Sequence, residues 1–189
     1  MIVFNDNKHI NLPYNKEHYF DFLDDDLDDS HFWSAVSFQT TNNNESTVSL
    51  KHVSVLETLF KQIILQLDSG SPWIVNHFYK DFDWFPNNDE NLNSLRTLFK
   101  ENKIQNTYRG ALSFMADDLI KFANNLILYP YILSYRDLDI SHTELPFIIK
   151  ITNHLTIDLF CTDKLVLRKV INDNSLINLT VKEYRGSAL

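Results

Sequence analysis

The apolar residues between positions 56 and 67 constrain the fold most, because they recur at steps of three and four residues. They are Leu56, Leu59, Phe60, Ile63, Ile64 and Leu67. This spacing predicts an amphipathic helix with one apolar face. Gly70 follows where helices commonly stop, so the pattern sets both the type and the end of this element.

Helical spacing also appears in four other stretches of the chain. It predicts helices over residues 16–29, 89–99, 117–126 and 165–171, the last of them capped by Asp163. After the third of these, Tyr129-Pro130 favours extended chain, because proline disfavours the helical conformation of the residue before it.

Runs rich in β-branched and aromatic residues predict strands between and after these helices. The predicted strands cover residues 32–40, 108–115, 147–151, 155–160 and 176–184. Thr152-Asn153 lies between two of them and suits the tight turn of a hairpin. The polar stretch 40–47 reads as a loop.

This order of elements predicts an α+β fold in which a largely antiparallel sheet packs with three to four helices. A chain of 189 residues fits one domain. A weak candidate boundary lies at residues 86–89, and we favour a single domain over residues 1–189. The single cysteine, Cys161, excludes an internal disulfide and reads as a buried core residue.

The single cysteine is typical of a reducing compartment, so we expect a cytoplasmic protein. The first residues lack the basic and apolar segments of a secretory signal, and no apolar stretch approaches the ~20 residues of a membrane-spanning helix. The chain also contains no glycine-rich phosphate loop and no zinc-binding sequence pattern, so no cofactor is expected.

The negative charge is concentrated in one short segment. Residues 16–30 hold seven acids and one base, a net charge of −6, whereas the whole chain carries −8. The acids at the centre of this segment are Asp24, Asp25, Asp26, Asp28 and Asp29. Such a patch repels nucleic acid and lipid head groups and attracts basic proteins, although a solvated helix face is the simpler interpretation.

A calcium loop is a third interpretation of the aspartate run. Asp24, Asp26 and Asp28 occupy the first, third and fifth positions of an EF-hand loop. The sixth position needs glycine but holds Asp29, and the twelfth needs glutamate but holds Ala35. The sequence therefore predicts no metal site here.

Six aromatic residues lie between positions 72 and 86, interleaved with acids. Because interface anchors are commonly tryptophan and tyrosine within a charged rim, this segment is a candidate contact for a protein partner. The residues concerned are Trp73, Tyr79, Asp81, Asp83 and Trp84. The alternative, which we rank first, is a loop pinned to the core by its own aromatics.

Two histidines occur in matching tetrads, His52-Val53-Ser54-Val55 and His154-Leu155-Thr156-Ile157. This pattern resembles the paired signature of the two-histidine phosphoesterases, which are small α+β enzymes that cleave RNA or cyclic phosphodiesters. The resemblance implies that His52 and His154 face each other across a cleft as acid and base. It also implies that Ser54 and Thr156 bind the phosphate.

A second enzyme hypothesis rests on Asp137-Leu138-Asp139, with His142 three residues further on and Asp158 in the predicted hairpin. Such groups could hold a divalent ion in a hydrolase. The sequence leaves open whether His142 and Asp158 lie near Asp137 and Asp139. We favour turn-forming or ion-paired roles for both aspartates.

Taken together, these features favour a small acidic cytoplasmic protein that binds another protein. It resembles in kind the bacterial immunity proteins of contact-dependent and other polymorphic toxin systems, which are small, acidic and free of cofactor motifs. That resemblance implies a basic partner such as a nuclease toxin. The alternatives are the two enzymes above and a regulatory or structural domain without catalysis.

Overall fold

The fold is built on one layer of antiparallel strands with helices on one side of it. The computed structural model describes residues 2–6, 12, 34–40, 50–77, 82–85, 88–134, 136–173 and 178–184. The strands are β1 (Val3–Asn5), β2 (Ser34–Thr40), β3 (Trp73–His77), β4 (Ala111–Phe114), β5 (Leu138–His142), β6 (Phe147–Ile151), β7 (Ile157–Cys161) and β8 (Leu179–Glu183). The helices are α2 (Leu50–Gln66), α3 (Asn93–Glu101), α4 (Ala116–Leu133) and α5 (Lys164–Asp173), with a 3₁₀ turn η2 (Glu90–Leu92).

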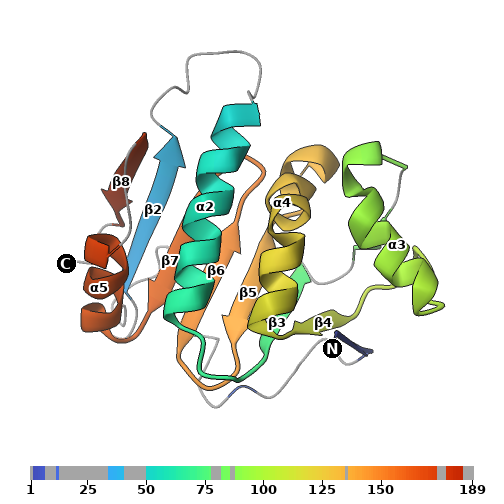
Figure 1. Ribbon diagram of the computed structural model, residues 1–189, viewed down its shortest axis with the longest axis horizontal. Coiled ribbons are helices and arrows are strands. Elements are labelled where there is room, and N and C mark those ends of the chain that lie inside the picture. Colours follow the sequence, from blue (N-terminus) through green and yellow to red (C-terminus); the bar gives the residue numbers. More distant parts are fainter. Residues whose placement is uncertain are drawn as a thin grey trace.

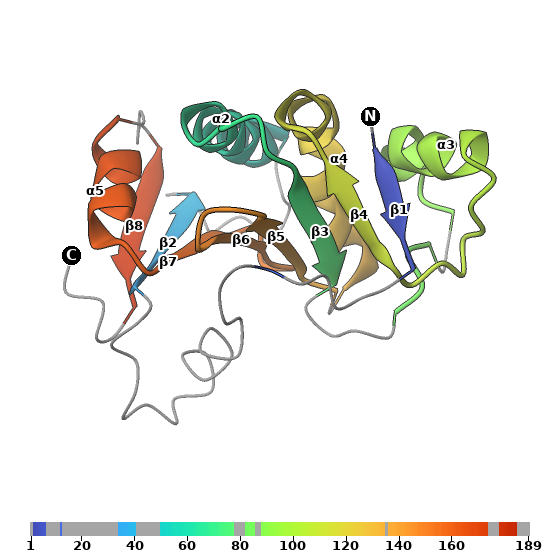
Figure 2. The ribbon, with the colours of Figure 1, turned by 90° about the horizontal axis from the view of Figure 1, so that it is seen from below.

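The eight strands form a single sheet in the order β1-β4-β3-β5-β6-β7-β2-β8, and every neighbouring pair is antiparallel. The four helices of the described residues all lie on one side of this sheet (Figures 1 and 2). The predicted α+β class, with an antiparallel sheet and three to four helices, is therefore confirmed.

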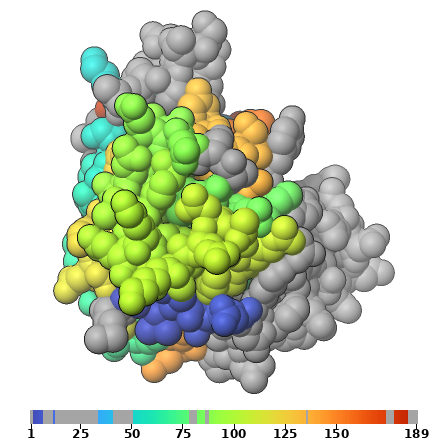
Figure 3. All heavy atoms as spheres, turned by 90° about the vertical axis from the view of Figure 1, so that its right-hand side faces the viewer, coloured from blue at the N-terminus to red at the C-terminus, as the bar shows by residue number. Residues whose placement is uncertain are grey.

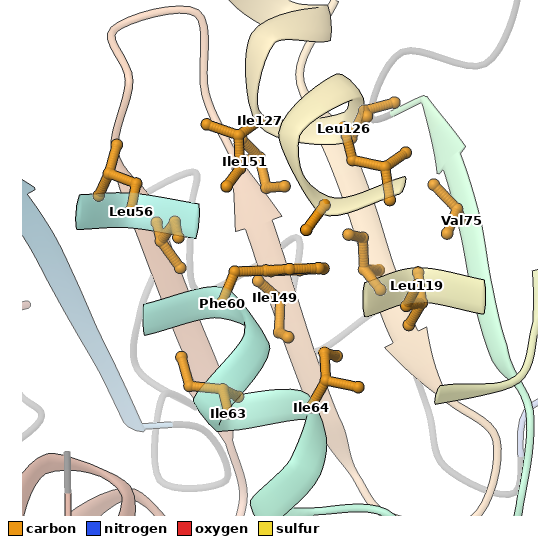
Figure 4. Packing of buried hydrophobic residues seen from close by; sticks show 14 of the residues in the cluster. Leu56, Phe60, Ile63, Ile64, Val75, Leu119, Leu126, Ile127, Ile149 and Ile151 are labelled. Carbon is orange, nitrogen blue, oxygen red and sulfur yellow. The ribbon is translucent and has the colours of Figure 1, made fainter. Parts of the chain in front are cut away.

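The core lies between this sheet and the two long helices. Phe60 of α2 and Leu119 and Ile127 of α4 pack over Ile149 and Ile151 of the central strand β6 (Figure 4). All five of these side chains have 0% exposed surface. Burial of this apolar area stabilises the fold by about 25 cal/mol per Å².

The predicted helix over 56–67 is confirmed, but it begins earlier than the apolar stripe. Helix α2 starts at Leu50 and thus includes His52 and Ser54 in its first turns. The apolar spacing does not predict the first turns of α2, because the polar, exposed residues Lys51 and Ser54 interrupt the apolar pattern there.

The prediction that Tyr129-Pro130 ends the third helix is wrong. Helix α4 runs to Leu133 with Pro130 inside it. A proline near the end of a helix removes only one backbone hydrogen bond there. Tyr129, Pro130 and Leu133 are all buried, so packing of the last turn against the core outweighs that loss.

The hairpin predicted around Thr152-Asn153 is confirmed as β6 and β7, which pair from Phe147↔Cys161 to Ile151↔Ile157. Asp163 accepts a hydrogen bond from the Leu165 backbone at 2.8 Å, as its predicted capping role requires. The predicted helix over 16–29 and most of the predicted loop over 40–47 lie outside the described residues.

Side chains alternate between the two faces of the sheet, as the pleat of a strand requires. Val36, Ile149 and Leu159 belong to the core beneath the helices. Their sequence neighbours therefore point to the opposite face, which we call the far face. Within the described part of the chain, no helix is long and apolar enough to span a membrane.

Candidate functional site

A row of polar residues crosses the far face from strand to strand. It consists of Asn76 on β3, Asp139 on β5, Lys150 on β6, Asp158 on β7 and Ser37 on β2, and we call it the polar row. Each member stands directly opposite the next in the strand register. Opposed side chains on antiparallel strands have Cβ atoms about 5 Å apart, so the register brings together residues that are far apart in the sequence.

The polar row is largely buried. Asp139 is 1% exposed, Asp158 is 4% exposed and Ser37 is 6% exposed. Ile148 and Phe160, which lie on the same face, have no exposed surface. Aspartate is almost never fully buried unless it is paired, so each of these carboxyl groups needs a compensating partner.

Lys150 supplies the positive charge in the middle of the row. Its Nζ lies 3.3 Å from Oδ2 of Asp137, and its two strand neighbours opposite are Asp139 and Asp158. Asp137 also accepts a hydrogen bond from the Asn153 backbone at 3.0 Å. Lys150 therefore pairs with Asp137 and stands between two further aspartates in the strand register.

Asp158 is the most extensively hydrogen-bonded member. Its two carboxyl oxygens accept from the Thr156 hydroxyl at 3.2 Å and from the Tyr184 hydroxyl at 2.9 Å. Burial raises the pKa of Asp158, although hydrogen bonds from Ser37 and Tyr184 and the charge of Lys150 oppose that rise. The same burial and the Asp158 charge raise the pKa of Tyr184.

Two buried polar atoms beside Asp139 have no hydrogen-bond partner. They are Oγ of Ser141, a residue that is 1% exposed, and Oδ1 of Asn76. Ser141 lies two residues after Asp139 on β5, so both side chains point to the far face. An unsatisfied buried polar atom costs about 1–3 kcal/mol.

The geometry of the described residues does not support the metal hypothesis. Asp137 pairs with Lys150, and Asp139 and Asp158 stand opposite Lys150 on the two neighbouring strands. His142 is three residues from Asp139 on the same strand and therefore lies on the opposite face, with its ring 4.6 Å from that of Trp73. Among the described residues, no group of three or more histidine, cysteine or acidic side chains is arranged to hold a metal ion.

His142 and Ser69 lie close enough to suggest a nucleophile and its base, since Ser69 Oγ is 3.3 Å from His142 Nε2. However, His142 Nδ1 accepts hydrogen bonds from the backbone of Glu144 and Leu145, at 3.0 and 2.9 Å. The neutral ring must then carry its proton on Nε2. Nε2 cannot take a proton from Ser69 in that tautomer, so the pair is structural.

The two histidine tetrads are not brought together as the resemblance implies. His52 and Ser54 are on α2, which packs on the helical side of the sheet. His154 is exposed in the turn between β6 and β7. The Thr156 hydroxyl bonds Asp158 on the far face. The sheet therefore separates the hydroxyl groups that would have to share one phosphate.

The residues predicted to contact a partner divide into three groups. The aspartates at 24–26 and 28–29, together with Tyr79 and Asp81, lie outside the described residues. Asp83 is half-buried and pairs with Arg109, whose Nε lies 2.6 Å from its carboxylate. Trp73 and Trp84 are fully buried in the core.

The expectation that these two tryptophans anchor a partner needs correction, because neither has exposed surface. Trp84 is held by three hydrogen-bonding groups around it. Its indole donates to the Gly110 carbonyl at 2.9 Å, and its own carbonyl accepts from the Tyr129 hydroxyl at 2.6 Å. His77 completes the cluster, with Nε2 at 2.7 Å from that hydroxyl. The aromatics thus pin their segment to the core.

A surface groove of about 560 Å³ lies between α3 and α4, on the side of the molecule seen in Figure 3. Leu98 and Phe122 form its apolar part, and Glu101, Asp118 and Lys121 are the charged residues around it. These charges have mixed sign and surround an open depression. The groove therefore indicates no particular ligand.

Sequence reasoning missed Ser37, Asn76, Ser141, Lys150 and Tyr184. One signal was available, because Lys150 and Asp158 each interrupt an otherwise apolar strand. A charged residue in such a strand must face a partner, but the identity of that partner depends on the strand register.

Comparisons of the chain with protein-family models, curated proteins and solved structures found no match.

Proposed function

We propose that this protein binds and neutralises a basic protein, and that its partner is a bacterial nuclease toxin. In that role it would be an immunity protein of a contact-dependent or other polymorphic toxin system. The observation that carries the proposal is the concentration of charge: residues 16–30 bear −6 of the chain's −8. A cationic nuclease surface attracts such a segment over about one Debye length.

The mechanism is occlusion of the toxin's substrate site. Nucleases bind phosphate groups with lysine and arginine side chains. The aspartates at 24–26 and 28–29 carry charges of the same sign as those phosphates, so they would compete for the same cations.

The test is capture of partners from the source cells at low and at high salt, followed by identification and a direct affinity measurement. The key variant replaces the five aspartates at 24–26 and 28–29 with asparagine. The control replaces five acids elsewhere, E90Q, E101Q, D117N, D173N and E183Q, all of which are exposed. The two variants change the net charge equally but at different places.

We expect one basic protein whose affinity falls with salt and is lost in the first variant only. We also expect the intact protein to inhibit the partner's nuclease activity at equimolar ratio. An affinity that salt does not change, or an equal loss in both variants, would show that the charged segment is not the binding surface.

A further inference from the structure

We propose that His142 is a pH-dependent clasp, and that its protonation opens the turn between β5 and β6. The clasp consists of the His142 ring and the groups that it bonds on its two sides. The backbones of Glu144 and Leu145 lie on one side, and Leu67 and Ser69, which follow α2, lie on the other. This device is independent of the toxin partner proposed above.

The first argument is the role of Nδ1. This atom accepts hydrogen bonds from the backbone N–H groups of Glu144 and Leu145, at 3.0 and 2.9 Å. A ring nitrogen can accept a hydrogen bond only while it carries no proton. Because Nε2 already carries the proton of the neutral ring, a second proton must bind to Nδ1. Both turn amides then lose their acceptor and face a donor instead.

The second argument is that the other side of the ring is compatible with both protonation states. The Leu67 backbone hydrogen-bonds to the ring, and Ser69 Oγ lies 3.3 Å from Nε2. Nε2 carries a proton in the neutral ring and in the charged ring, so these contacts survive protonation. The ring therefore stays bound to the segment after α2 while it releases the turn.

The third argument is the charge around the ring. Glu144 in the turn and Asp68 in the segment after α2 are exposed acids, and the charge of each favours the protonated ring. Trp73, which stands opposite His142 on β3, carries no charge. Two arrangements of one turn are thus available. Nδ1 accepts from the turn backbone in the closed form, and Nδ1–H donates to the Glu144 carboxylate in the open form.

Burial sets the pH range of the clasp. The ring has no exposed surface, and its burial lowers the pKa of His142 below the ordinary value of 6.5. Opening brings the ring into contact with water and returns its pKa toward 6.5. The open form therefore binds the proton more tightly, and its population increases as the pH falls below 6.5.

The opening is local. The Thr143 backbone and hydroxyl both donate to the Pro72 carbonyl, at 3.2 and 2.7 Å. Neither bond involves the ring or a titratable group, so both hold Thr143 in place in acid. On the other side of the turn, Phe147 is the first residue of β6 and is fully buried. The change is therefore expected at Glu144 and Leu145 and not in the sheet.

The experiment is a pH titration of the full-length, isotope-labelled protein between about pH 7.5 and 5, followed by NMR of the backbone amides and the histidine rings. We expect the amide protons of Glu144 and Leu145 to shift upfield, because they lose a hydrogen bond. Their midpoint should equal that of the His142 ring and lie below 6.5. About 90% of the shift should be complete one pH unit below the midpoint, as titration by one proton requires. The amides of Ile149 and Ile151 in β6 should keep their positions.

Two variants identify the groups responsible. His142→Asn is the matched control, because its carboxamide oxygen can accept from both turn amides and does not titrate. In this variant both amides should keep their closed-state shifts over the whole range. Glu144→Gln removes an acid that favours the charged ring, so it should lower the midpoint. Glu144 is exposed, and this variant keeps the test decisive if His142→Asn fails to fold.

Three outcomes would overturn the clasp. In the first, the His142 ring titrates while the amides of Glu144 and Leu145 keep their shifts. In the second, these amides shift with the same midpoint in His142→Asn, which would assign the change to another group. In the third, the amides of β6 change together with those of the turn, which would show unfolding of the whole domain instead of a local opening.

Discussion

Lys150 Nζ lies 3.3 Å from Oδ2 of Asp137, and this contact ties the central strand β6 to the residue that precedes β5. Both side chains are mostly buried, with 13% and 18% of their surface exposed. A buried ion pair is weak evidence for stability, because desolvation offsets its attraction. Removing only one partner is a different matter, since the remaining charges are then uncompensated.

Lys150→Met should therefore destabilise the protein strongly. The change keeps most of the side-chain volume but leaves Asp137 without its ion-pair partner and removes a positive charge that lowers the pKa of Asp158. We expect a loss of about 3 kcal/mol in the free energy of unfolding at neutral pH, measured by urea denaturation. The loss should shrink in acid, where the carboxyl groups take up protons.

Lys182→Met is the matched control, because Lys182 lies on the same face but is exposed on the edge strand β8. It should change stability by less than about 0.5 kcal/mol. Equal losses in the two variants would contradict a central role for Lys150.

Asp158 should make the protein less stable as the pH rises. Burial raises its pKa above the ordinary value of 3.8, so the native state binds this proton more tightly than the unfolded chain. Protonated Asp158 therefore contributes to the free energy of unfolding below pH 3.8, and this contribution is lost as the pH rises through the raised pKa. The amount lost is about 1.4 kcal/mol for each unit by which the pKa is raised.

Asp158→Asn removes this titration and keeps the volume. Its stability relative to the unmodified protein should increase with pH across that interval, as measured by urea unfolding at a series of pH values. A constant difference between the two proteins would show that the pKa of Asp158 is the same in the folded and unfolded states.

The titration of His142 should make the protein less stable as the pH falls, which is the opposite of the effect of Asp158. Burial lowers its pKa below 6.5, so the unfolded chain binds the proton more tightly, and stability is lost as the pH falls below 6.5. His142→Asn places a carboxamide oxygen near Nδ1, where it can still accept from the Glu144 and Leu145 backbones. That variant should show a flatter pH dependence over this range.

His142→Gln is the comparison, because its longer carboxamide reaches toward Nε2 and leaves those two backbone donors unpaired. We expect it to be less stable than His142→Asn by about 1–3 kcal/mol at pH 8. The order would be reversed if contact with Ser69 mattered more than the backbone bonds.

Tyr129→Phe should lower the free energy of unfolding by about 1–3 kcal/mol. The hydroxyl donates to the Trp84 carbonyl and lies 2.7 Å from His77 Nε2, so its removal leaves two buried polar groups unpaired. Tyr131→Phe on the same helix is the control, since Tyr131 is 42% exposed. Thermal unfolding of both variants checks the difference, and similar Tm values would contradict it.

Local patterns in the sequence were enough for several elements of the fold. The three- and four-residue spacing of Leu56 to Leu67 predicted most of α2, and the apolar runs around Thr152-Asn153 predicted the β6–β7 hairpin. These features depend on residues close together in the chain. The local rule for proline gave a wrong prediction at Pro130. The last turn of α4 is stabilised by burial against the core, which is a tertiary effect that the local sequence does not show.

The candidate site depended on more than local pattern. The sequence singled out Asp137, Asp139 and Asp158, but it also grouped His142 with them. Residues three positions apart on a strand point to opposite faces. This rule separates His142 from Asp139, but it applies only because Leu138–His142 is a strand, which the sequence analysis did not predict. Lys150, which pairs with Asp137 and stands opposite Asp139 and Asp158, was not recognised.

The sequence by itself determined most of the helices, the strands β2, β4, β6, β7 and β8, the α+β class and the place where negative charge accumulates, because short-range spacing and composition encode these properties. It did not predict β1, β3 or β5. Only the tertiary structure decided that Asn76, Asp139, Lys150, Asp158 and Ser37 form one row. The reason is physical: the row exists through the register of five strands, of which β2 and β3 are distant in the chain from each other and from β5, β6 and β7. A shift of one residue in any strand would turn its member of the row into the core.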